Sequence, residues 1–183
     1  NARTGLIFRC FRTRNEIFLS KLFTTYVRPL IEGNTTAWNP HSIGDIQALE
    51  QVQRAFTRRI PTLSNLSYPE RNTMLGLKSS EERRLRFDLI EAFKTVKNLS
   101  PINFDSLFTL RHFQGSRAPH SLQLYQPVAN TVFRSHSLSH RIVPVWNYLP
   151  KSCIEADTVA KFKKKLEEAD LSQHLRCYPA YYI

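Results

Sequence analysis

The fold class follows most directly from residues 43–60, which read IGDIQALEQVQRAFTRRI. Apolar side chains recur here at steps of three and four residues, which is the period of one face of an α-helix. The members of this apolar stripe are Ile46, Leu49, Val52, Phe56 and Ile60. Burial would stabilise the fold by about 1.5–3 kcal/mol for each large apolar side chain. Pro61 follows the stripe and should end the helix.

The rest of this helix carries basic side chains. Arg54, Arg58 and Arg59 lie off the apolar stripe, and Arg54 and Arg58 are one helical turn apart. A guanidinium group presents a planar fork of donors that matches the oxygens of a phosphate. The stretch therefore predicts a helix that packs on one face and contacts an anionic partner with the other.

The first 31 residues are expected to form one helix, or two helices broken near Thr13–Asn15. Apolar side chains again recur at helical steps. Pro29 should limit the second helix, because proline disfavours helical geometry in the residue before it. The residues expected to face inward are Leu6, Ile7, Phe8, Phe11, Ile17, Phe18, Leu22 and Tyr26.

Two more helices are predicted, both with basic surfaces. The first begins at Ser79, which together with Glu82 has the spacing of a capping box. The second runs from Thr158 to Ala169. Their apolar stripes are Leu85, Leu89, Phe93 and Val96 in the first, and Val159, Phe162, Leu166 and Ala169 in the second. Their basic residues are predicted to lie on the surface and contact phosphates: Arg83, Arg84, Arg86, Lys94, Lys97, Lys161, Lys163, Lys164 and Lys165.

The segment between these two helices has a different character. No Asp or Glu occurs between Asp105 and Glu155. Short apolar pieces at residues 122–125 and 130–133 lie between turn residues, which is the pattern of short strands or extended segments. The predicted fold is therefore mainly α, with a helical bundle followed by a smaller mixed region that ends in a helix.

The overall charge indicates a polyanionic partner. The 183 residues include 26 Lys and Arg against 15 Asp and Glu, which gives a formal net charge of +11. Only 5 residues are Gly, and neither GxGxxG nor GxxxxGKS/T occurs, which argues against nucleotide-binding enzymes of those classes. The 3 cysteines are scattered and predict no closed disulfide framework, as in a reducing compartment. No apolar run approaches the length of about 20 residues that a membrane span needs.

No catalytic or metal site is predicted from these residues. His136 and His140 are four positions apart, and His174 and Cys177 form an H-x-x-C pair, but neither pair is completed to the four ligands of structural zinc. Cys153 has no assignable base, so an unreactive thiol is the favoured interpretation. Two-metal phosphoryl transfer needs converging carboxylates, and the acids of this chain are scattered. An independent zinc-dependent enzyme is therefore the least favoured function.

Several phrases follow one another along the chain in a set order. They are LFTTYVRPLIE at 22–32, AWNP at 37–40, DI…LEQVQR…FTRR within 45–59, LSYPER at 66–71, LGL at 75–77, ERRLR…DL within 82–89, RIVPVWNYLP at 141–150 and FK…L within 162–166. In this order and spacing, the sequence resembles the region downstream of the catalytic palm in non-LTR (LINE-type) retrotransposon reverse transcriptases of the jockey-like and chicken-repeat-like kind. The likeness covers roughly residues 2–170.

The resemblance implies a helical thumb in residues 1–97, which grips the template–primer duplex, and a post-thumb region in residues 98–183. It implies RNA and RNA–DNA hybrid as partners, together with the palm and fingers of the parent polymerase, and neither a membrane nor a small-molecule substrate. The magnesium-binding aspartates of the family lie in the palm, so no catalytic residue, metal ligand or cofactor is carried over to this chain. Because the first residue is Asn1, we expect a piece of a longer protein that is inactive alone. Nuclear and cytoplasmic ribonucleoprotein is the localisation that the family implies.

Two functions stay open at this point. The first is a noncatalytic fragment of an RNA-directed DNA polymerase, which positions the primer duplex through its phosphates. The second is a basic helical protein-interaction module, a decayed or host-retained remnant of such an element that contacts an acidic protein surface. Phosphate contacts would weaken steeply with salt, whereas a protein partner would depend on buried aromatic residues.

Overall fold

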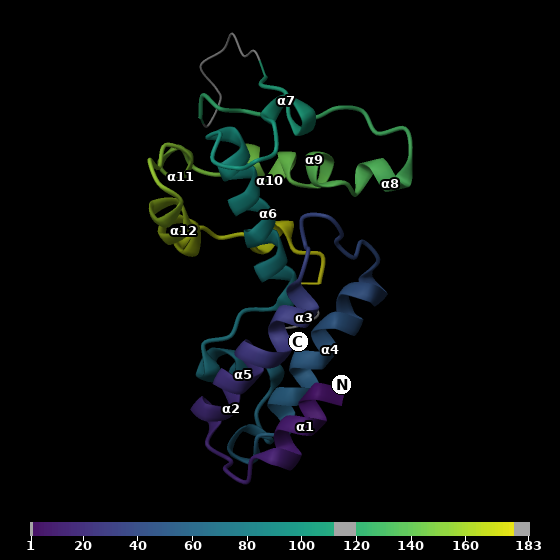
Figure 1. Ribbon diagram of the computed structural model, residues 1–183, viewed down its shortest axis with the longest axis vertical. Coiled ribbons are helices and arrows are strands. Elements are labelled where there is room, and N and C mark those ends of the chain that lie inside the picture. Colours follow the sequence, from purple (N-terminus) through teal and green to yellow (C-terminus); the bar gives the residue numbers. More distant parts are fainter. Residues whose placement is uncertain (1, 112–119, 178–183) are drawn as a thin grey trace. The chain divides into compact units, whose positions relative to one another are not determined.

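The computed structural model describes residues 2–111 and 120–177, and it is predominantly helical (Figure 1). The chain divides into two compact units. Unit 1 comprises Asn1–Asn34, Pro40–Arg83 and Leu175–Ile183, and unit 2 comprises Thr35–Asn39 and Arg84–His174. The prediction of a mainly α fold is confirmed.

Unit 1 consists of one long helix, several short ones and the first turn of a helix that continues in unit 2. They are α1 (Ala2–Cys10), α2 (Glu16–Leu22), α3 (Arg28–Glu32), α4 (Ile43–Arg58), the 3-10 turn η2 (Pro61–Leu63), α5 (Tyr68–Leu75) and the start of α6 (Ser80–Val96). The break expected near Thr13–Asn15 separates α1 from α2. There the side chain of Asn15 caps α2 by accepting the backbone N–H of Phe18 at 2.9 Å.

The expected limit at Pro29 is wrong, because the helix continues through the proline to Glu32. Between α2 and α3 lies a π-helical turn, η1 (Phe23–Val27), in which the N–H of Arg28 donates to the carbonyl oxygen of Phe23, five residues back. Pro29 then stands in the first turn of α3. A helix tolerates a residue without an N–H at that place.

Three phenylalanines form the centre of the core of unit 1. The ring of Phe56 lies 5.0 Å from that of Phe8 and 4.7 Å from that of Phe23, measured between centroids. Leu19 and Ile60 are fully buried beside them. The apolar stripe predicted for residues 43–60 is confirmed, with Ile46, Phe56 and Ile60 buried and Leu49 and Val52 half-buried.

Part of the stripe expected in the first 31 residues is wrong. Leu6, Phe11, Ile17, Phe18 and Tyr26 are exposed. The buried residues of α2 and η1 are instead Leu19, Leu22, Phe23 and Val27. For Tyr26 the reason is the wide π turn, which shifts the helical phase so that a regular spacing of three and four no longer selects the buried face.

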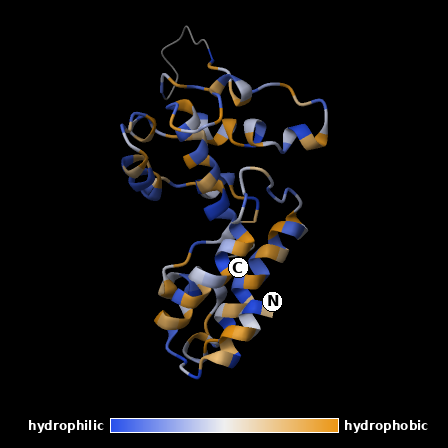
Figure 2. Ribbon diagram, in the orientation of Figure 1, coloured by the Kyte–Doolittle hydropathy of each residue, from blue (hydrophilic) through white to orange (hydrophobic). Residues whose placement is uncertain are grey.

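Unit 2 contains most of α6 and a series of shorter helices. These are α7 (Phe104–Leu107), α8 (Val132–Ser135), α9 (Leu138–Arg141), α10 (Val143–Tyr148), α11 (Lys151–Ile154), α12 (Val159–Glu168) and the 3-10 turn η3 (Ser172–His174). Phe93 of α6 stacks on Phe162 of α12 with ring centroids 4.2 Å apart, and Trp146 of α10 is fully buried beside them. Figure 2 shows hydrophobic and hydrophilic residues sharing α6 and α12, as expected for helices that pack on one face.

The short strands expected in the C-terminal region are wrong. Among the described residues, β-type pairing is limited to one antiparallel bridge between Leu110 and Leu124. The side chain of Asn147 accepts the N–H of Leu124 and donates to its carbonyl oxygen, both at 2.8 Å, so these groups are not open to a partner strand. Thr131 caps α8 by accepting the N–H of Arg134, which makes residues 132–135 helical.

The division into units falls inside α6, between Arg83 and Arg84. The sequence-based division at 97/98 assigns all of α6 to the first region. The structure differs because Leu89 and Phe93 of α6 belong to the core of unit 2. The assignment of residues 1–97 to a polymerase thumb concerns the family and stays a prediction.

Candidate nucleic-acid interface

Helix α4 and its C-cap residue, Arg59, hold the three arginines that the sequence grouped together. Its first turn is fixed by Ser42, whose hydroxyl accepts the backbone N–H of Asp45 at 3.1 Å. Arg54 is half-buried, whereas Arg58 and Arg59 are exposed at the end of the helix. None of the three guanidinium groups forms a hydrogen bond or ion pair with a residue that the structure describes. Their charges are therefore not neutralised by contact with a carboxylate of the described chain.

An aromatic ring orients one of the exposed arginines. The guanidinium carbon of Arg59 lies 4.2 Å from the centroid of the Phe8 ring. Arg14, in the loop after α1, lies 5.9 Å from the same ring. Cation–π attraction of this kind contributes about 0.5–1 kcal/mol at exposed positions. Two basic residues far apart in sequence are thereby held near one side chain.

A second pair of arginines shares the ring of Tyr68. Arg54 lies 5.0 Å and Arg71 lies 5.6 Å from its centroid. Arg71, in α5, is buried, with its Nε donating to Thr57 Oγ1 at 3.1 Å and its Nη1 to the carbonyl oxygen of Leu66 at 2.6 Å. Sequence analysis missed Arg71, because the spacing within α5 gives no sign that this residue returns to α4.

Buried polar groups hold the hydroxyl of Tyr68. Its hydroxyl donates to Glu50 Oε1 and accepts from Gln53 Nε2 at 3.1 Å. The second oxygen of Glu50 accepts the backbone N–H of Ser80 at 2.7 Å, at the start of α6. Burial raises the pKa of Glu50, although these hydrogen bonds oppose the shift. Through these two bonds Glu50, in α4, links α5 and α6. The start of α6 also attracts its negative charge, because helix N-termini favour anions.

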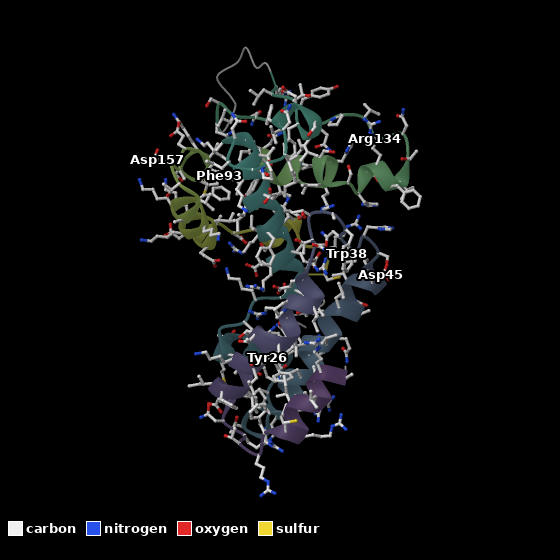
Figure 3. All side chains as sticks on the ribbon, in the orientation of Figure 1. Tyr26, Trp38, Asp45, Phe93, Arg134 and Asp157 are labelled. Atoms are coloured by element: carbon white, nitrogen blue, oxygen red, sulfur yellow. The ribbon has the colours of Figure 1, made fainter. Side chains whose placement is uncertain are left out.

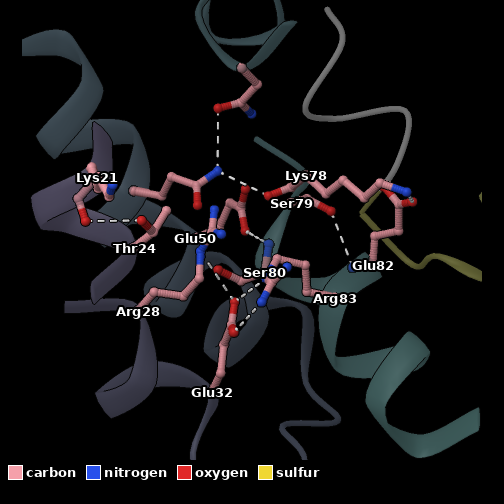
Figure 4. Close-up of polar contacts among 12 residues, drawn as sticks. Lys21, Thr24, Arg28, Glu32, Glu50, Lys78, Ser79, Ser80, Glu82 and Arg83 are labelled. Atoms are coloured by element: carbon pink, nitrogen blue, oxygen red, sulfur yellow. Dashed lines mark hydrogen bonds and ion pairs between the residues drawn. The ribbon is translucent and has the colours of Figure 1, made fainter. Parts of the chain in front are cut away.

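Arg83 is not a free surface cation. It makes a two-pronged contact with Glu32 through Nε at 2.6 Å and Nη2 at 2.9 Å (Figure 4). Arg28 approaches the same carboxylate at 3.6 Å. The predicted role of Arg83 in phosphate binding stays untested, but in this structure its charge is directed to Glu32.

The surface positions predicted for Arg84 and Arg86 are wrong, since both side chains are buried in unit 2. Arg84 lies against Trp38, with its guanidinium carbon 4.4 Å from the ring, and donates to Asn39 Oδ1 at 3.2 Å. Arg86 donates to the carbonyl oxygen of Leu166. Long side chains can bury their apolar stems and satisfy their charged ends internally, which a periodic pattern does not reveal.

The lysines of unit 2 differ in their surroundings. Lys94 pairs with Glu91 at 3.2 Å, and Lys97 lies 5.7 Å from the centroid of the Phe93 ring. Lys161 pairs with Asp157 at 2.8 Å, and Lys165 donates to the carbonyl oxygen of Ser152. Lys163 and Lys164 form no hydrogen bond or ion pair with a described residue. Figure 3 shows Asp157 near the surface of this unit. Lys163 and Lys164 are the exposed, unpaired members of this group.

Comparison with known proteins gives one relative. Over 96 residues the chain is 30% identical to the uncharacterized protein B0403.1 of Caenorhabditis elegans. The matched region is 51% of this chain and 46% of that protein, so the chain spans under half of the relative's length. No protein-family model and no solved structure matches.

The candidate metal ligands do not come together. In the described part of the chain, no group of three or more His, Cys, Asp or Glu residues is placed to hold a metal ion. Cys153 is buried, and burial raises the pKa of its thiol, which disfavours the reactive thiolate. No described helix combines the length and apolar character that crossing a membrane requires.

Two histidines of unit 2, His120 and His140, are buried in the protein interior. His120 Nε2 lies 3.1 Å from the carbonyl oxygen of Trp146, and His140 Nδ1 lies 3.0 Å from Ser137 Oγ. The other ring nitrogen of each has no hydrogen-bond partner among the described residues. Burial lowers the pKa of both rings.

These histidines should make unit 2 less stable at mildly acid pH. An unfolded histidine has a pKa near 6.5, so as the pH falls below about 6.5 the unfolded chain takes up protons before the folded chain does. Between pH 7 and 5.5, the free energy of unfolding of His120→Gln/His140→Asn should fall by about 1 kcal/mol less than that of the wild type. Urea denaturation at each pH measures this difference. Parallel pH profiles for the two proteins would contradict it.

Proposed function

We propose that this chain binds nucleic acid through backbone phosphates, as a noncatalytic C-terminal region of a non-LTR retrotransposon reverse transcriptase. The observation that carries the proposal is the exposure of Arg58 and Arg59, which form no ion pair with a described residue. The net charge of +11 and the ordered phrases that resemble the family support it. Contacts to phosphates would position a duplex and perform no chemical step.

The test is binding of the whole chain to a short RNA–DNA hybrid at two salt concentrations. If about five phosphates are neutralised, affinity should fall several hundred-fold between roughly 50 and 200 mM salt, because bound counterions are released. Arg58→Ala/Arg59→Ala should weaken binding at low salt and reduce the log–log salt slope by about 2. Fluorescence anisotropy with labelled hybrid measures both quantities.

Lys151→Ala provides the matched control. Lys151 is exposed and basic like Arg58, but it lies 3.4 Å from Glu155, so its charge is already balanced. We expect this variant to keep the wild-type salt slope. An identical slope in the arginine variant and the wild type would argue against the proposed interface. Failure of the folded wild-type chain to bind at low salt would remove the proposal.

A protein partner is the second candidate function, and one surface feature favours it. A hollow of ≈ 230 Å³ is lined by Ile17, Ser20, Lys21, Thr24, Met74 and Leu75, from α2, η1 and α5. Ile17 is 74% and Met74 63% exposed, which is unusual for two large apolar side chains at one place. Lys21 adds a positive charge suited to an acidic segment. This candidate would take first place if the hybrid does not bind.

A further inference from the structure

Two guanidinium groups from different helices contact the same aromatic ring in unit 1. Arg54 comes from α4 and Arg71 from α5, at 5.0 and 5.6 Å from the centroid of Tyr68. Arg58 follows Arg54 by one turn of α4, so three positive charges lie in this part of the unit. Burial lowers the pKa of Arg71, and the charges of Arg54 and Arg58 act in the same direction.

No carboxylate of the described chain makes contact with these three arginines. The hydrogen bonds of Arg71 go to two neutral oxygens, those of Thr57 and Leu66. Of the two acids nearest in sequence, Glu50 is bonded to Tyr68 and Ser80, and Glu70 accepts the N–H of Ser67 in the capping box of α5. Among the described residues, no contacting carboxylate therefore balances the three positive charges.

The position of the ring is determined by interactions beneath it. Tyr68 is 5% exposed, and its hydroxyl is held by Glu50 and Gln53. Gln53 also donates to Asn72 Oδ1 at 3.2 Å and to the carbonyl oxygen of Lys78 at 3.1 Å. Because these bonds fix the ring, the two guanidinium groups lying against it lose little further freedom when a ligand binds.

We propose that Arg54, Arg58 and Arg71 form a preorganised site for one phosphate group of a nucleic-acid backbone, with Tyr68 as a positioning residue. A phosphate would supply the negative charge that the site lacks, and guanidinium forks fit its oxygens. The nature of the ligand rests on the proposed function. The site itself rests on the contacts of Tyr68 and on the absence of a contacting carboxylate among the described residues.

The site is tested without nucleic acid by titrating the whole chain with inorganic pyrophosphate. In spectra of the arginine Nε–H groups, the signal of Arg71 should shift saturably, and Arg54→Gln/Arg58→Gln should weaken the apparent affinity at least about tenfold. Arg3→Gln/Arg9→Gln is the control, since both residues are exposed on α1 and outside the site. No saturable shift of Arg71, or the same affinity in the site variant, would overturn the site.

Positioning by Tyr68 has its own readout. Tyr68→Phe keeps the ring and removes the hydroxyl that anchors it to Glu50. We expect this variant to bind pyrophosphate more weakly, while the same number of arginine signals shifts as in the wild type. A merely structural role would alter stability and leave the affinity of the folded chain unchanged.

Binding of the RNA–DNA hybrid then decides the source of the phosphate. Arg54→Gln/Arg58→Gln should reduce the log–log salt slope by about 2, and the Arg3/Arg9 control should leave it unchanged. A steep wild-type slope that the site variant retains would overturn this site while leaving the proposed function in place. Saturable pyrophosphate shifts without any hybrid binding would reject the proposed function and the nucleic-acid ligand.

Discussion

Trp146→Ala should lower the free energy of unfolding of unit 2 by about 3–5 kcal/mol, because it empties the centre of an apolar core. Trp146 is fully buried, with its ring centroid 6.3 Å from that of Phe162. Its indole N–H also donates to the carbonyl oxygen of Leu122 at 2.8 Å. Urea denaturation followed by the fluorescence of Trp38, the other tryptophan and also in unit 2, measures the loss.

Trp146→Phe separates packing from hydrogen bonding. It retains an aromatic ring and leaves the Leu122 carbonyl oxygen without the indole donor, which should cost about 1–3 kcal/mol. A loss as large as that of the alanine variant would show that the hydrogen bond, and not the volume of the ring, is the main contribution. A loss below about 1 kcal/mol for alanine would contradict the central place of Trp146 in the core.

Asp88→Asn should destabilise unit 2 by about 3 kcal/mol, because it leaves a largely buried arginine without its counter-charge. Arg141 donates to the two oxygens of Asp88 at 2.9 and 3.1 Å and to the carbonyl oxygens of His136 and Thr35 at 2.9 and 2.8 Å. The carboxylate of Asp88 is 1% exposed. Burial raises the pKa of Asp88, while Arg141 opposes the shift.

The double variant Asp88→Asn/Arg141→Met is the control for this pair. Removing both charges avoids an unpaired buried ion, and methionine fills much of the space of the arginine stem, so we expect the double variant to be more stable than Asp88→Asn alone. Equilibrium urea denaturation of the four proteins of the cycle gives the coupling energy. Additive losses would mean that the two residues do not stabilise unit 2 as a pair.

The resemblance to reverse transcriptases bears on the family and ligand of this protein, whereas the structure bears on the arrangement of its side chains. The sequence phrases indicate a family and with it a substrate, and these stay proposals until hybrid binding is measured. The arrangement of Arg54 and Arg71 on Tyr68 is a feature of the folded chain. It can be tested with pyrophosphate independently of the family.

The sequence by itself determined the helices and their buried faces where the helical period is regular. Residues 43–60 and 79–97 show this, since Phe56 and Phe93 are buried as their spacing predicts. The cap at Ser79 was also anticipated, and its hydroxyl accepts the N–H of Glu82 at 3.2 Å, because a cap needs only residues within one turn. The phase was lost across the π turn before Pro29, since one extra residue in a turn is not visible as a change in composition.

Only the tertiary structure decided which basic residues are buried or paired. Arg86 meets the backbone of Leu166 and Arg83 meets Glu32, partners that are 80 and 51 positions away in sequence. Arg71 joins Arg54 only because two helices meet at Tyr68. A charged side chain has the same hydropathy on a surface and in a satisfied interior, so its place depends on partners that the chain brings together when it folds.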